Sequence, residues 1–187
     1  MASETGICNR ALQLLGASRI TALTDANSKS ARECSVAYEP LRDALLRSHP
    51  WGFAIKRVQL AADAVPLVYG TGYTYTLPAD ALRILPNNDS ANDWVLEGRS
   101  IVSNWAAPLN VRYIRLVTDP NIMDPLFREV LAGQIAVATC EALTGSSTKQ
   151  AVIEQRMAAL LATAFRTGGL EQRPADPVAS SWVTAGD

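Results

Sequence analysis

The sequence has few of the residues that enzymes use for acid–base or metal chemistry. It contains one histidine, His49, and three cysteines that lie far apart in 187 residues. A histidine base needs a nucleophile and an orienting group, and no serine stands in a nucleophile-elbow motif. The cysteines form no Cys-x-x-Cys pair, so a zinc site is not indicated. The residues therefore predict a protein without a catalytic histidine, a bound metal or a cofactor.

Lysine is also scarce, and the chain has almost no net charge. The formal net charge is −1, without the basic surplus that is typical of nucleic-acid-binding proteins. The only lysines are Lys29, Lys56 and Lys149, so arginine supplies nearly all the positive charge. Arginine is enriched at protein interfaces because its guanidinium forms forked hydrogen bonds. A GC-rich coding bias explains the same composition, and the sequence leaves both explanations open.

A membrane span and a secretion signal are not expected. The most apolar segment, residues 126–143, carries Arg128, Glu129, Gln134 and Glu141, which predicts a buried helix. The N-terminus has no basic stretch followed by an apolar one, as a signal peptide would. The three cysteines fall on apolar stripes of expected helices, which favours buried thiols over disulfides.

Four helices are predicted, because apolar residues recur three or four positions apart. They cover about residues 3–15, 28–47, 124–145 and 146–169. Ser30 with Glu33 matches a capping box at the start of the second helix, and Pro40 predicts a kink or a break inside it. The pair Gly168-Gly169 is expected to end the fourth helix.

Between residues 53 and 117 the spacing of the apolar residues changes to two, as in β-strands. Tyr73 and Tyr75 alternate with threonines, which favours a strand. Residues 94–97 and 100–103 predict a hairpin that turns at Gly98. Five or six short strands, antiparallel to one another, are expected in this region.

These elements predict an α+β fold with an inserted β subdomain. Helices from residues 1–52 and 119–167 form a four-helix bundle, and residues 53–118 form a small antiparallel β subdomain. Residues 168–187 contain prolines and small residues without periodicity, so an extended C-terminal tail is expected.

A group of acids offers an enzymatic alternative. Asp80, Asp89, Asp93 and Glu97 gather in the strand region, and a pair of such acids can hydrolyse a glycosidic bond. Because most of them stand in turns and in a polar loop, solvated turn acids are the interpretation that the sequence favours.

A group of bases offers a second alternative, nucleic-acid binding. Cations flank the aromatic residues Trp51 and Phe53, an arrangement that can hold a nucleic acid. These cations are Arg42, Arg47, Lys56 and Arg57. Glu39 and Asp43 lie among them, which favours ion pairs within or between subunits.

An ordered set of short motifs runs through the chain. It begins with Asn9-Arg-Ala-Leu-Gln-Leu-Leu-Gly-Ala17, Ile20-Thr-Ala-Leu23, Tyr38-Glu-Pro-Leu-Arg-Asp-Ala-Leu-Leu-Arg47 and His49-Pro-Trp51. It continues with Tyr75-Thr-Leu-Pro-Ala-Asp80, Glu97-Gly-Arg99, and Arg112-Tyr113 before Thr118-Asp-Pro120. In this order, over about residues 4–164, the motifs resemble the head-to-tail adaptor proteins of short-tailed bacteriophages, the tail tubular protein A family.

The resemblance implies a structural virion protein rather than an enzyme. Such a protein forms a ring, usually of twelve copies, between the portal protein and a tail nozzle of the tail tubular protein B type. The ring leaves a channel for the genomic DNA, which passes at genome ejection without sequence-specific binding. The implied location is the neck of the virion, after assembly in the cytoplasm of the bacterial host.

The resemblance also implies a role for the C-terminal segment, which commonly reaches the portal in this family. The corresponding residues are Leu170, Arg173, Pro174, Pro177, Val178, Trp182 and Val183. An aromatic anchor such as Trp182 can dominate a binding interface, which favours docking over simple disorder. Two other functions remain open: a virion-associated cell-wall hydrolase, and a neck or completion protein of a long-tailed phage.

Overall fold

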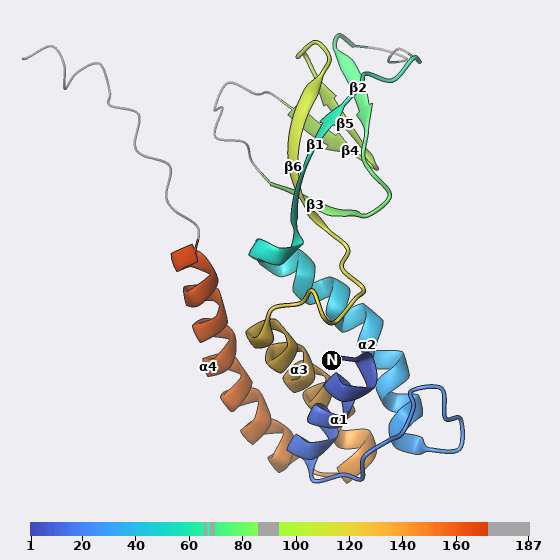
Figure 1. Ribbon diagram of the computed structural model, residues 1–187, viewed down its shortest axis with the longest axis vertical. Helices are drawn as coiled ribbons and strands as arrows, with labels where there is room; N and C mark the ends of the chain where they lie inside the picture. Colours follow the sequence, from blue (N-terminus) through green and yellow to red (C-terminus); the bar gives the residue numbers. More distant parts are fainter. Residues whose placement is uncertain (66, 68–69, 86–93, 172–187) are drawn as a thin grey trace, which may run out of the picture.

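The computed structural model describes residues 1–65, 67, 70–85 and 94–171, and it has an α+β fold. Figure 1 shows the helices gathered at one end of the molecule and the strands at the other. The α-helices are α1 (Glu4–Leu15), α2 (Lys29–Ser48), α3 (Pro125–Thr144) and α4 (Ser147–Glu171), and η1 (Gly52–Ala54) is a 3₁₀ helix. The strands are β1 (Ile55–Leu60), β2 (Tyr73–Thr76), β3 (Ala81–Leu85), β4 (Trp94–Glu97), β5 (Ser100–Ser103) and β6 (Leu109–Arg115).

Side-chain caps set the starts of three helices. The Ser3 hydroxyl accepts a hydrogen bond from the Gly6 N–H at 3.0 Å, and Asp124 accepts one from the Leu126 N–H at 2.7 Å. At α2 the cap is Ser28, which accepts from the Ala31 N–H at 3.3 Å. The predicted capping box at Ser30 is therefore wrong, because an extended serine two residues earlier already supplies the acceptor.

The predicted ends are confirmed for α1 and α3 and wrong for α4. Gly16 and Gly145 have φ values of 68° and 63°, the left-handed conformation that glycine adopts most easily. In contrast, α4 continues through Gly168-Gly169 to Glu171. The glycines keep a helical backbone there because the preceding turn is held by a ring contact between Phe165 and His49. Residues 168–171 are therefore helical rather than extended tail, and residues 172–187 lie outside the described part.

Pro40 does not break α2, which runs without interruption from Lys29 to Ser48. The proline removes the hydrogen bond that the carbonyl of Val36 would accept. Val36 is 77% exposed, so water can reach this side of the helix and satisfy the carbonyl. The cost of the proline is therefore smaller here than it would be on the buried face.

Helix α3 is the centre of the helical part, and α1, α2 and α4 each pack against it. Its predicted burial is confirmed: nine of its residues are buried, including Phe127, Leu131 and Ile135. The contact with α4 is close because Gly133 lacks a side chain. A Cβ atom at Gly133 would lie 1.6 Å from Sδ of Met157. Helix α4 makes its main contact with α3, and only Ile153 and Ala164 are buried among its residues 147–169.

The six strands form two antiparallel sheets of three strands, with the orders β1-β6-β3 and β2-β5-β4. The predicted hairpin between β4 and β5 is confirmed, and it turns at Gly98 with a φ of 59°. The central strand β6 contributes to both cores of the molecule. Val111 and Tyr113 belong to a small core between the sheets, whereas Ile114 belongs to the large helical core.

The cysteine prediction is confirmed: Cys8, Cys34 and Cys140 are free and buried. Cys8 on α1 and Cys34 on α2 are neighbours. Their hydrogen bond, with burial second, raises the pKa of the Cys8 thiol above its ordinary value. Both side chains are fully buried and help to pack α1 against α2.

Candidate functional site

Aromatic rings join the helical part to the strands, at the end of α2. The ring of His49 stacks on Phe165 of α4 at 4.3 Å, and Trp51 meets the edge of Phe127 at 5.1 Å. Phe53 also contacts Phe127 at 5.1 Å. These rings come from α2's C-terminus, η1, α3 and α4, so one cluster fixes four elements relative to one another. The predicted aromatic patch at Trp51 and Phe53 is thus internal structure.

Hydrogen bonds to main-chain carbonyls strengthen the same connection between the end of α2 and the strands. The Arg83 guanidinium donates to the carbonyls of Arg47 and Ser48 at 3.0 and 3.2 Å, and Arg47 donates to the Leu82 carbonyl. Trp51 Nε1 donates to the Leu45 carbonyl at 2.9 Å. The last carbonyls of a helix lack partners within it and attract positive charge. Arginine here satisfies α2's C-terminus, a structural use of a residue that the sequence associated with interfaces.

His49 has a structural environment, as the sequence predicted. Burial, and then the positive charge of Arg83, lower the pKa of its imidazole. Within the described residues, Nε2 of His49 is buried and has no hydrogen-bond partner. The ring also lies close to the backbone of α4, because a Cβ atom at Gly168 would be 3.3 Å from Nε2. The neutral form is therefore favoured, and its role is to hold the end of α4.

Asp80 is engaged within the β region rather than facing open solvent. It accepts hydrogen bonds from the Tyr113 hydroxyl at 2.9 Å and from Lys56 Nζ at 3.3 Å. Burial alone would raise the pKa of Asp80, but these two hydrogen bonds outweigh it and hold the pKa below its ordinary value. A carboxyl that stays ionised is a poor general acid. Glu97 is exposed on β4, whereas Asp89 and Asp93 lie outside the described residues.

The ion pair predicted around Arg42 is confirmed. Arg42 Nε lies 2.8 Å from the carboxylate of Asp43, and its guanidinium stands 5.8 Å from the ring centre of Tyr38. Arg42 is only 4% exposed. This arginine is therefore committed to the fold and has little capacity to contact a nucleic acid.

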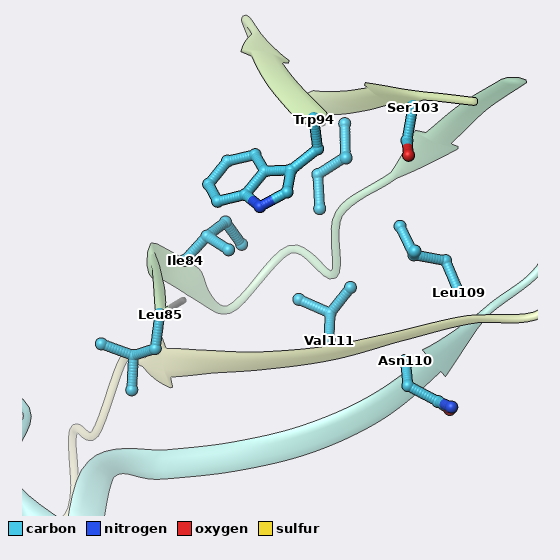
Figure 2. A pocket seen from close by; sticks show the side chains of 8 residues that line it. Ile84, Leu85, Trp94, Ser103, Leu109, Asn110 and Val111 are labelled. Carbon is cyan, nitrogen blue, oxygen red and sulfur yellow. The ribbon is translucent and has the colours of Figure 1, made fainter. Parts of the chain in front are cut away.

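The space between the two sheets is small. Figure 2 shows Trp94 and Ile84 closing it from one side and Leu109 and Val111 pointing into it from β6. Its volume is about 20 Å³, room for about one water molecule. The interior of the β region is therefore packed, and ligand binding is better sought elsewhere.

An apolar groove lies among α2, α3 and α4, with a volume of about 440 Å³. Its lining is almost entirely apolar apart from Gln134 and Glu154. The apolar residues are Leu41, Val130, Val137, Ala138, Met157, Ala158 and Leu161. Met157 and Leu161 belong to the apolar spacing that predicts the fourth helix. They are partly exposed because α4 packs mainly against α3, and the sequence gives no signal of that arrangement.

The predicted portal-binding residues are only partly within the described chain. Leu170 belongs to α4, and the other six lie in residues 172–187. Among described residues, no set of three His, Cys, Asp or Glu side chains converges as a metal site would require. None of the described helices combines the length and apolar character that a membrane span needs. Comparison with known proteins gives no match, either to a protein-family model or to a curated protein.

Proposed function

We propose that this protein is a ring-forming head-to-tail adaptor of a bacteriophage, joining the portal to the tail nozzle and surrounding part of the DNA channel. The observation that carries the proposal is the ordered set of motifs, because its members contact one another. Asn9 forms two hydrogen bonds with the backbone of Ile20, at 2.8 and 2.9 Å. Trp51 bonds to Leu45, and Asp80 to Tyr113. The motifs that carry the resemblance thus lie at positions that contact one another in the fold.

In this proposal the four helices act as a bundle that builds the wall of the ring, and the β subdomain projects from it. A ring needs two different, complementary surfaces on each copy, because every interface joins the front of one subunit to the back of the next. The groove among α2, α3 and α4 is an apolar surface that a second copy can cover. Helix α4, which makes its main contact with α3, forms one wall of this groove.

The C-terminal segment provides the contact with the portal in this proposal. Residues 172–187 follow α4 directly and contain Trp182 with Val178 and Val183, which can act as apolar anchors. Because α4 extends to Glu171, removal of residues 172–187 leaves every described element in place. This truncation therefore tests the portal contact without removing a helix.

The decisive experiment combines the full-length protein with purified portal under assembly conditions. Electron microscopy is expected to show a ring at the base of the portal, and the mass of the particle gives the copy number. The truncated chain is expected to fold but to attach to the portal at least about tenfold more weakly, as loss of one hot-spot anchor predicts. A full-length chain that fails to associate with portal would overturn the proposal.

A matched pair of substitutions tests the ring contact separately. Ala158→Arg places a charge in the groove, whereas Thr163→Arg places it on an exposed position five residues further along α4. Both residues are exposed in the single chain, so both variants should unfold within about 0.5 kcal/mol of the parent. Only Ala158→Arg is expected to prevent ring formation. Equal ring formation by the two variants would exclude the groove as the subunit contact.

A further inference from the structure

The sheet β1-β6-β3 has an unusual charge for a chain of net charge −1. Its three strands contain Lys56, Arg57, Arg83, Arg112 and Arg115 and no acidic residue. The other sheet, β2-β5-β4, contains one acid and no base. Among the strand residues the positive charge is therefore concentrated in one sheet, where Lys56 pairs with Asp80 just before β3.

Two of these arginines stand directly opposite each other on the outer face of the sheet. Arg57 of β1 pairs with Arg112 of β6, and Gln59 pairs with Asn110 on the same face. Figure 2 shows Asn110 pointing away from the space between the sheets, opposite to Leu109 and Val111. Like charges at directly opposed positions of antiparallel strands destabilise a sheet. The pair is thus a local cost to the fold.

No acid compensates for this cost within the described residues. The ion pairs there join Arg10 to Glu129, Arg42 to Asp43 and Lys56 to Asp80. In the same part of the chain, Nε of Arg112 is buried and lacks a hydrogen-bond partner. That atom is out of reach of solvent, but the Arg57 side chain is exposed and that of Arg112 is partly exposed, so an external anion can approach both residues.

The shape of this face points to an extended anion. Neither Arg57 nor Arg112 lines the space between the sheets or the groove beside α4, so the two guanidiniums do not converge on either hollow. The amide side chains of Gln59 and Asn110, joined by a 3.2 Å hydrogen bond, continue the polar row next to the arginines. A planar guanidinium binds phosphate oxygens through two parallel hydrogen bonds, and a row of such donors suits a repeating phosphate backbone.

We propose that the outer face of β1-β6-β3, through Arg57 and Arg112, binds the phosphodiester backbone of duplex DNA. The choice of DNA among polyanions rests on the proposed function, which brings DNA past each subunit. Contacts to phosphates alone carry no sequence information. With two arginines the binding is weak, in the range of about 10⁻⁴ to 10⁻⁶ M that is typical of non-specific complexes. Such a face guides the genome and lets it pass.

The test measures binding of the full-length protein to a fluorescent DNA duplex by anisotropy, between about 50 and 200 mM salt. The double variant Arg57→Gln with Arg112→Gln is expected to bind about tenfold more weakly at the low-salt end. The slope of log affinity against log salt should fall in magnitude by about two, one for each arginine that no longer binds a phosphate. The control is Arg156→Gln with Arg166→Gln, which removes the same charge from exposed positions of α4 and should leave both values unchanged.

Several outcomes would overturn the proposal. One is equal weakening by the two double variants, which would show a response to net charge only. Another is displacement of DNA by a polyglutamate of equal charge, which would assign the face to an acidic protein partner. If the first double variant unfolds, Arg57→Gln alone, at an exposed position, must still reduce the salt slope by about one. Ring formation on the portal is measured separately. Loss of the DNA-binding proposal therefore leaves the proposed function standing, and a chain that forms no ring can still be tested for DNA binding.

Discussion

The two sides of α3 are packed in different ways. On one side α1 buries Ile7, Cys8, Ala11, Leu12 and Leu15, and α2 adds its own apolar stripe. On the other side α4, a longer helix, buries only Ile153 and Ala164 in the part whose side chains are described. The first side forms the large core of the fold, whereas the second leaves apolar surface within reach of a partner. Four substitutions probe this difference.

The largest effect is expected for Phe127→Ala, at the centre of the tightly packed region. Phe127 is fully buried and contacts both Trp51 and Phe53. Its truncation leaves a cavity and should lower the free energy of unfolding by about 3–5 kcal/mol. Urea unfolding followed by circular dichroism measures this. A loss below about 1 kcal/mol would contradict the central position given to α3.

The next largest effect is expected for Gly133→Ala, which acts on the loosely packed side. The new Cβ atom collides with Met157, so α4 must shift or Met157 must move, at about 1–3 kcal/mol. Amide exchange should speed up in α4 while α1 stays protected. Combining the substitution with Met157→Ala removes the collision and should restore part of the stability. Equal loss of protection in α1 and α4 would show that the two sides unfold as one unit.

A smaller effect is expected for Asn9→Ala on the α1 side. The variant loses two hydrogen bonds to the backbone of Ile20 and should be destabilised by about 1–2 kcal/mol. Gln13→Ala removes an exposed amide from the same helix and serves as the control, with a change within about 0.5 kcal/mol. Because alanine has the highest helix propensity, neither change should weaken the helix itself, and an equal loss in both variants would contradict a specific role for the loop contact.

The smallest effect concerns pH, at the point where α4 meets His49. Because the folded chain lowers the pKa of His49 below 6.5, the unfolded chain takes up the proton first as pH falls. The stability from the neutral ring is therefore present above about pH 6.5 and is lost as pH falls through the folded pKa. Urea unfolding of the parent and of His49→Phe at about pH 7 and pH 5 measures this difference. If the difference in stability between the parent and His49→Phe is the same at both pH values, protonation of His49 does not affect the stability of the fold.

The helices and strands were predictable to the extent that local residues determine them. Apolar spacing predicted α1 and α3, and alternation with Gly98 predicted the β4–β5 hairpin. The end of α4 was missed because a contact far away in the sequence, Phe165 on His49, overrides the glycine signal. The order β1-β6-β3 was also out of reach, since it depends on pairing between residues about fifty positions apart.

The surfaces were less predictable than the fold. Arginine was noticed as a residue type, but its uses differ: Arg42 pairs with Asp43, Arg83 binds the end of α2, and Arg57 faces Arg112. These roles depend on the tertiary fold, and for Arg57 and Arg112 on the strand register. The groove beside α4 depends likewise on which helix packs where. Helical spacing predicts an apolar face without saying whether a neighbour covers it.

The pairing of β1 with β6 has a mechanical consequence. These strands are the incoming and outgoing connections of the β subdomain, and they are hydrogen-bonded neighbours from Ile55 and Ile114 onward. The β region is thus attached by paired strands instead of two independent linkers, and β3 also pairs with β6 beside Ile114. Hydrogen-bonded strands resist stretching and bend together, so a load applied to the far end of the β region is carried directly into the buried base at Ile114 and the end of α2.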